Sequence, residues 1–159
     1  MASTRKSARK PVKRAPAKKR KAAPKAKAPA ASPPMANAWA WHELMVKDVA
    51  AARSFYGALL GWKAEVMPMP SGPYTIFSHD GAGVGGCMAI PSAPDGKPVC
   101  PPNWLVYVGV ADVDATARKA VSLGGKVSAP PMDIPGVGRF AVLEDPDGAT
   151  FAVFRSSRT

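Results

Sequence analysis

Glu43 is the residue best suited to chemistry, because it is a carboxylate in the middle of the apolar segment Trp39–Val46. A carboxyl group buried in such surroundings resists ionisation, and its pKa rises toward the range in which a general base works at neutral pH. Tyr107 follows 64 residues later, and its hydroxyl can donate a hydrogen bond to an oxyanion. The pair predicts proton abstraction or isomerisation next to a carbonyl group. The alternative is that Glu43 makes a structural hydrogen bond or ion pair that stabilises the sheet.

Three apolar residues are predicted to bind the ligand. Trp41, Met45 and Phe77, together with Tyr107, can form a surface for an aromatic or amphiphilic small molecule. Aromatic residues in strands also form cores, so packing alone is the alternative for them. Arg139 opens a later strand, where its guanidinium can bind an anionic group or simply remain solvated.

The chain offers few ligands for a metal ion. It contains two histidines and two cysteines, and Cys87 and Cys100 are too far apart for a CxxC motif, so two structural thiols are expected. His42 follows Trp41 and should point to the other face of the strand, unless the strand register shifts by one residue. No cofactor and no metal site is therefore predicted, and a divalent metal held with the help of His42 is the alternative.

These residues lie in a sequence that repeats itself at an offset of 64 residues. The segments Asp48–Gly61 and Asp112–Gly125 correspond, and six residue pairs in and beside them are identical. Such a repeat indicates one supersecondary unit used twice. Each aspartate is predicted to cap a helix by accepting amide hydrogens of its first turn, and each glycine to end one.

Strand patterns flank both predicted helices, so each copy has the order βαβββ in an α+β fold. The strands are expected at 39–46, 62–67, 74–78, 84–90, 104–110, 126–129, 139–143 and 150–154. Five prolines make residues 91–103 a linker between module one, 37–90, and module two, 104–156. Together they form one domain, 37–159.

Residues 1–36 are predicted to be a disordered basic tail. The first 34 residues contain 12 Lys or Arg and no acidic residue, so of 22 basic and 11 acidic residues the rest of the chain keeps 10 and 11. A Lys/Ala/Pro composition without aromatic residues cannot form a core. The tail is expected to bind nucleic acid or another polyanion. Its densest positive cluster is Lys18, Lys19, Arg20 and Lys21.

Two alternatives to this role are an inert solubilising extension and a translation start at Met35. The tail has no apolar signal core, and no segment of the chain approaches the length of a membrane span. A cytoplasmic protein without membrane contact is therefore expected. Association with the nucleoid through the tail is a further alternative.

Two motifs make the chain similar to the vicinal oxygen chelate superfamily, which includes glyoxalase I, extradiol dioxygenases, bleomycin-binding proteins and fosfomycin-resistance enzymes. They are the run Phe55-Tyr56 to Leu60-Gly61-Trp62 and the run Glu144-Asp145-Pro146-Asp147-Gly148. The resemblance implies a U-shaped, eight-stranded mixed sheet around a central cavity, with the helices outside. It places Glu43 and Tyr107 in that cavity beside a small-molecule ligand. It also makes a homodimer the alternative to a monomer.

Metal-dependent members of this superfamily carry His or Glu on the first and last strand of each module. Here the corresponding positions fall on Trp41, on residues 84–90 without His, Asp or Glu, on Leu105 or Trp104, and on Ala152. The metal positions of the family are therefore not filled. The resemblance then implies a lyase or isomerase that uses Glu43 as base without the usual metal. A non-catalytic module that binds an antibiotic-type molecule is the alternative.

Overall fold

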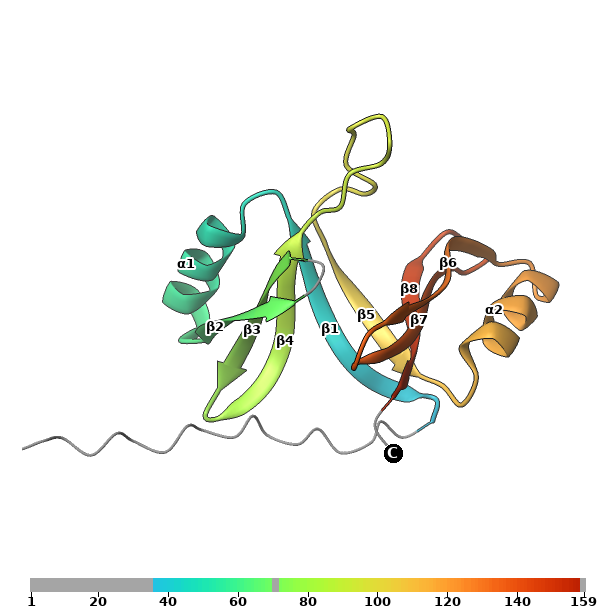
Figure 1. Cartoon of the computed structure of the whole chain (residues 1–159), viewed down its shortest axis with the longest axis horizontal. Coiled ribbons are helices and arrows are strands. Elements are labelled where there is room, and N and C mark those ends of the chain that lie inside the picture. Colours follow the sequence, from blue (N-terminus) through green and yellow to red (C-terminus); the bar gives the residue numbers. More distant parts are fainter. Residues whose placement is uncertain (1–35, 70–71, 158–159) are drawn as a thin grey trace, which may run out of the picture.

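The computed structural model describes residues 36–69 and 72–157, which form one eight-stranded sheet with two helices on its outer side (Figure 1). The elements are β1 Ala38–Val46, α1 Val49–Leu60, β2 Lys63–Met69, β3 Gly72–His79, β4 Ala82–Ala89, β5 Asn103–Gly109, α2 Val113–Ser122, β6 Lys126–Ile134, β7 Gly138–Glu144 and β8 Thr150–Ser156. The order βαβββ therefore occurs twice, as the repeat predicts. The predicted basic tail lies outside the described residues.

The strand order of the sheet is β2-β3-β4-β1-β5-β8-β7-β6. Each module contributes one half, and the halves join where β1 pairs antiparallel with β5, with Glu43 opposite Leu105. Within the modules, β1 pairs parallel with β4 and β5 pairs parallel with β8. The sheet is therefore mixed and curved, as the resemblance implied, and the first strand of each module lies at its centre.

Both helices begin at the aspartates of the repeat. The Asp48 carboxylate accepts the amide hydrogen of Ala51 at 2.9 Å, and Asp112 accepts that of Ala115 at 2.9 Å. These bonds satisfy donors that a first helical turn leaves free. Helix α1 ends at Gly61, whose φ of 68° lies in the left-handed region that glycine adopts without strain. Among the described residues, no helix is long and apolar enough to cross a membrane.

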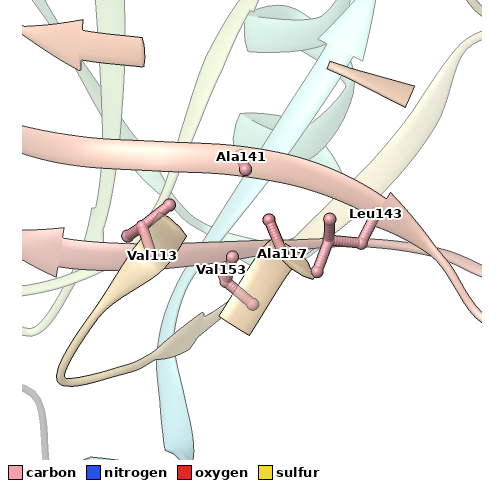
Figure 2. Close-up of a cluster of buried hydrophobic side chains, with 5 residues drawn as sticks. All are labelled: Val113, Ala117, Ala141, Leu143 and Val153. Carbon is pink, nitrogen blue, oxygen red and sulfur yellow. The ribbon is translucent and has the colours of Figure 1, made fainter. Parts of the chain in front are cut away.

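Each helix covers its own hydrophobic cluster. Under α2, Val113 and Ala117 of the helix pack against Ala141 and Leu143 of β7 and Val153 of β8 (Figure 2). None of the five is more than 4% exposed. A second cluster under α1 contains Leu44, Ala52, Phe77 and Cys87. Burial of these side chains holds each helix against the outer face of the sheet.

Strand β6 is longer than the sequence predicts, since it continues to Ile134 through Pro130 and Pro131. It lies at the end of the strand order, and its pairing with β7 shifts register twice. Proline removes a hydrogen-bond donor, which an edge strand tolerates on its unpaired side. The position of the strand at the sheet edge therefore explains why two prolines did not end it.

We expect Leu143→Ala to lower the free energy of unfolding by about 2–5 kcal/mol, because it removes a fully buried side chain and leaves a cavity. Leu123→Ala is the matched control, since Leu123 is 68% exposed, and it should change stability by less than about 0.5 kcal/mol. Urea denaturation followed by tryptophan fluorescence measures both. Equal losses in the two variants would contradict the assigned core.

Candidate functional site

The helix-free face of the sheet carries a third apolar cluster, to which no helix contributes. Leu105, Tyr107 and Ala152 are its buried members, and the residues packed against them are Trp41, Met45, Phe140, Val142 and Phe154. The alternation predicted for the first strand is confirmed, because Leu44 packs in the cluster under α1 while Trp41 and Met45 belong to this one. Several members are only partly buried, so this face can contact a ligand.

Glu43 lies on this face at the junction of the modules and is 8% exposed. Tyr107 of β5 donates its hydroxyl hydrogen to Glu43 Oε2 at 2.7 Å, and Tyr74 of β3 donates to Oε1 at 2.9 Å. The indole Nε1 of Trp41 donates in turn to the Tyr74 hydroxyl at 2.9 Å. We call these four residues the Glu43 network. It joins three strands from both modules around one carboxyl group.

Burial raises the pKa of Glu43, and the hydrogen bonds from Tyr107 and Tyr74 lower it again in part. The pKa rises because the loss of hydration on burial disfavours the charged carboxylate more than the two hydrogen bonds favour it. Burial and the charge of Glu43 also raise the pKa of both tyrosines above its ordinary value. The tyrosines therefore remain protonated donors, and Glu43 is the member of the network that loses its proton most readily.

Gly86 makes room for this arrangement. It lies opposite Glu43 in the β1–β4 ladder, and a Cβ atom added there would overlap the Tyr74 hydroxyl. The sequence analysis did not identify Tyr74 or Gly86 as site residues. Tyr74 and Phe77 are both aromatic residues of one predicted strand, and the face that each occupies depends on how β3 pairs with β4. A glycine in a strand was a signal of close approach, but not of what approaches.

Phe77 does not lie beside Trp41 and Met45, and its predicted ligand contact is corrected here. It is fully buried in the cluster under α1, where its ring packs near those of Tyr56 and Trp62. Phe77 therefore follows the alternative given above, as a core residue.

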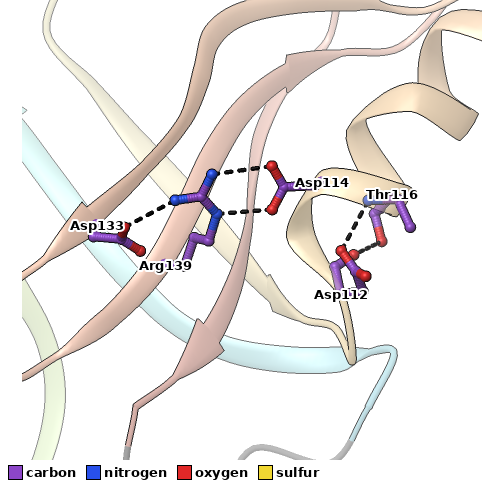
Figure 3. Close-up of polar contacts among 6 residues, drawn as sticks. Asp112, Asp114, Thr116, Asp133 and Arg139 are labelled. Atoms are coloured by element: carbon purple, nitrogen blue, oxygen red, sulfur yellow. Dashed lines mark hydrogen bonds and ion pairs between the residues drawn. The ribbon is translucent and has the colours of Figure 1, made fainter.

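Arg139 also lies away from the Glu43 network. Its Nε and Nη2 donate to the two carboxylate oxygens of Asp114 at 2.7 and 3.0 Å, and its Nη1 donates to Asp133 at 3.0 Å (Figure 3). These bonds raise the pKa of Arg139 and lower that of Asp114. The guanidinium of Arg139 therefore connects α2 to strands β6 and β7. The contact of Arg139 with an anionic ligand stays a prediction, beside the ion pairs that it makes in this structure.

The residues of this face do not fit the metal centre of the resembled superfamily. The resemblance assigns ligand positions to Trp41, Ala152 and either Leu105 or Trp104. Trp41, Leu105 and Ala152 lie in the helix-free cluster, and their side chains have no atom suited to a metal. His42 is exposed and pairs with Val106, next to but not on the face of Glu43. In the part of the chain that the structure describes, no three His, Cys, Asp or Glu side chains are grouped to hold a metal ion.

Two hollows in the surface, of about 420 and 380 Å³, lie away from the network. The first is lined by Ala50, Arg53, Ser54, Trp62 and Ala64, and the second by Asn37, Ala38, Trp39 and Val108. Neither includes Glu43 or its partners. A ligand beside Glu43 would therefore lie outside these two hollows, against the side chains of the helix-free cluster.

The class of this protein is defined by its fold, which is a curved mixed sheet built from two βαβββ modules with the helices outside. The model of the Glyoxalase/Bleomycin resistance protein/Dioxygenase superfamily matches residues 38–153, and the chain belongs to that family. This range includes both modules and the whole Glu43 network.

The chain is 45% identical over 116 residues to CFP32 of Mycobacterium tuberculosis, whose name assigns it provisionally as a glyoxylase. It is 41% identical over 126 residues to the anthracycline biosynthesis protein DauV of a Streptomyces species. These matches cover 72% and 73% of this chain but 42% and 46% of the relatives, so it spans less than half their length. An extradiol ring-cleaving dioxygenase from B. fuscum matches in structure, with a TM-score of 0.51 at 20% identity over 82% of this chain and 35% of the other, which shows the shared fold.

Gly86→Ala should displace Tyr74 and lower the free energy of unfolding by about 1–3 kcal/mol, because the added methyl group has no space. The matched control is Gly83→Ala in the same strand, where the nearest atom to an added Cβ is an ordinary 3.6 Å away on Trp41. Adding Tyr74→Ala to Gly86→Ala should recover part of the loss, as coupled neighbours do. Urea titrations of the four proteins measure this, and equal stability of the two glycine variants would contradict it.

Proposed function

We propose that this chain binds a small aromatic or amphiphilic molecule on the helix-free face and moves a proton next to a carbonyl group of that molecule. The observation that carries the proposal is the Glu43 carboxyl group, buried at the centre of an apolar face and bonded by two tyrosines. A base of this kind works best when its pKa approaches the working pH, and burial shifts Glu43 in that direction.

The reaction needs no partner beyond the ligand. Glu43 removes the proton from the carbon next to the carbonyl, so that the C–H bond breaks and its electron pair moves onto the carbonyl oxygen. A tyrosine hydroxyl close by stabilises the resulting enolate by donating a hydrogen bond. Return of the proton from Glu43 to a different carbon, or to the other side of the same carbon, completes an isomerisation without oxidant or reductant.

The composition of the face suggests the ligand class. Its cluster consists of aromatic and aliphatic residues together with Met45. Such a surface favours a planar apolar molecule over one that carries a phosphate or carboxylate. The names of the Streptomyces relatives support an aromatic ligand, since an anthracycline is a fused aromatic ring system.

Binding without turnover is the second candidate, and one observation favours it. Both oxygens of Glu43 already accept hydrogen bonds, and Trp41 closes the chain behind Tyr74. A fully bonded buried polar group can serve to hold strands in a unique arrangement. In that case, the network stabilises the sheet, and the apolar residues around it sequester an antibiotic-type molecule.

Proton transfer is tested by deuterium exchange of the α-hydrogens of 1-tetralone in D₂O, followed by proton NMR. We expect the full chain to accelerate exchange and Glu43→Gln to lose at least about 100-fold of that rate, as removal of a general base does. Glu65→Gln is the control, because Glu65 is exposed on strand β2. Quenching of daunorubicin fluorescence measures binding separately. Binding without exchange would support the second candidate. If the chain shows no binding and no exchange, the proposed function is contradicted.

We propose further that residues 1–34 tether the chain to nucleic acid. Their 12 positive charges and lack of acidic residues contrast with the nearly neutral remainder of the chain. Positive charges that contact phosphates release counterions, and this release makes binding strongly dependent on salt. The tail lies outside the described residues, so the proposal rests on its composition.

If half of the 12 charges contact phosphates, log K should fall against log salt concentration with a slope of about −5. Filter binding of the full chain to duplex DNA between low and physiological salt gives this slope. Replacing Lys18, Lys19, Arg20 and Lys21 by alanine should make the slope shallower by up to about 4. A weak response that hardly changes with salt in either protein would contradict the tether.

A further inference from the structure

We propose that the two oxygens of Glu43 have different roles. Oε1 is held as a permanent acceptor by the positioning residues Trp41 and Tyr74. Oε2 takes up the proton of the ligand, and this uptake releases the hydroxyl hydrogen of Tyr107 toward the ligand oxygen. The inference rests on the proposed proton transfer and deepens it, because it assigns the proton path and the source of the oxyanion donor.

The direction of the bonds on the Oε1 side follows from the chemistry of the donors. An indole N–H can only donate, so Tyr74 must accept the hydrogen of Trp41 at 2.9 Å. The single hydroxyl hydrogen of Tyr74 then points to Glu43 Oε1 at 2.9 Å. A proton on Oε1 would have to be donated to the Tyr74 oxygen, which already accepts the indole hydrogen of Trp41. The hydroxyl hydrogen of Tyr74 would then lose its acceptor. Trp41 therefore disfavours protonation on this side.

The Oε2 side has no such restriction. Among the described residues, the Tyr107 hydroxyl makes its hydrogen bond to Oε2 at 2.7 Å, and no donor corresponding to Trp41 stands behind it. Its oxygen can accept a hydrogen from a protonated Oε2, and its own hydrogen can then turn away. The ring centroids of Phe140 and Phe154 lie 6.3 and 6.5 Å from the ring centroid of Tyr107. These rings belong to the helix-free face, where the ligand is proposed to bind.

Proton uptake and oxyanion stabilisation are then one event. The C–H bond of the ligand breaks, its proton binds Oε2, and its electron pair moves to the carbonyl oxygen. The Tyr107 hydroxyl rotates from Oε2 to that oxygen, while Tyr74 keeps its bond to Oε1. Before the transfer, the hydrogen of Tyr107 is engaged, so the donor becomes available only when negative charge develops on the ligand.

The titratable groups that interact with Glu43 are few, which simplifies a test. They are Tyr74 on β3, Tyr107 on β5 and the thiol of Cys87 on β4, whose pKa burial raises to about 11. The chain contains three glutamates, Glu43, Glu65 and Glu144. Carbon-13 labelling of glutamate carboxyl groups therefore gives three NMR signals, and the Glu43→Gln variant identifies the one that belongs to Glu43.

We expect Tyr74→Phe to raise the titration midpoint of Glu43 more than Tyr107→Phe does. Loss of Tyr74 removes a donor mainly from the ionised state, whereas loss of Tyr107 also leaves the protonated Oε2 without an acceptor, and the two effects offset each other. The shorter bond belongs to Tyr107, so bond length alone predicts the opposite order. In a Trp41→Phe background, the two tyrosine variants should become similar.

A midpoint shift for Tyr107→Phe equal to or larger than that for Tyr74→Phe would overturn the assignment. Because this titration needs no ligand, it is independent of 1-tetralone exchange. If the two midpoint shifts differ but 1-tetralone does not exchange, the proposed proton transfer is refuted. The inferred difference between the two carboxyl oxygens of Glu43 would still hold. If Tyr74→Phe does not fold, Trp41→Phe replaces it, since removing the indole donor should also raise the midpoint more than Tyr107→Phe does.

Release of the Tyr107 hydroxyl is tested with 4-nitrophenolate, whose visible absorption reports its ionisation. Glu43→Gln imitates the protonated state, because its amide can donate to Tyr107 and accept from Tyr74. Adding Tyr107→Phe to Glu43→Gln should weaken phenolate binding about tenfold or more, and adding Tyr74→Phe should change it less than twofold. Equal losses, or no phenolate binding to Glu43→Gln at all, would contradict the release.

Discussion

The antiparallel pairing of β1 with β5 is the interaction on which the rest of the structure depends. It joins two modules that each have their own hydrophobic cluster and their own helix. It also places Glu43 of one module diagonally across from Tyr107 of the other, at 2.7 Å between their oxygens. Without this pairing, the carboxyl group would lack one of its two donors, and the helix-free face would consist of two separate halves.

The two faces of the sheet bury different kinds of side chain. On the helix side, apolar side chains such as Leu143 and Val153 gain stability by excluding water under a helix. On the helix-free side, a carboxyl group is buried at a cost that hydrogen bonds from Tyr74 and Tyr107 offset only in part, as its raised pKa shows. Gly86 contributes by lacking a side chain where the Tyr74 hydroxyl lies. A raised pKa is thus a consequence of how the strands pack, not of one neighbour.

Much of the fold was accessible from the sequence because its signals are local. Asp48 and Asp112 act through amides three residues away, and alternation separates Glu43 from Leu44. The site was less accessible, because Tyr74 reaches Glu43 only through the pairing of β3, β4 and β1. Phe77 was misplaced for the same reason, because its face depends on register. The partners of Arg139 come from α2 and β6, and local sequence signals do not identify them. The offset of the repeat pointed to Tyr107 because both modules use the same strand at the centre.

The side chains of the helix-free face determine what contacts the sheet can make there. Trp41, Leu105 and Ala152 lie together in the helix-free cluster, so this part of the face favours apolar contact. The carboxyl oxygens of Glu43 have unequal surroundings, because Trp41 donates a hydrogen bond to Tyr74 and, among the described residues, no such donor stands behind Tyr107. In the proposed proton transfer, this difference assigns proton uptake to Oε2 and leaves the hydrogen bond from Tyr74 to Oε1 in place.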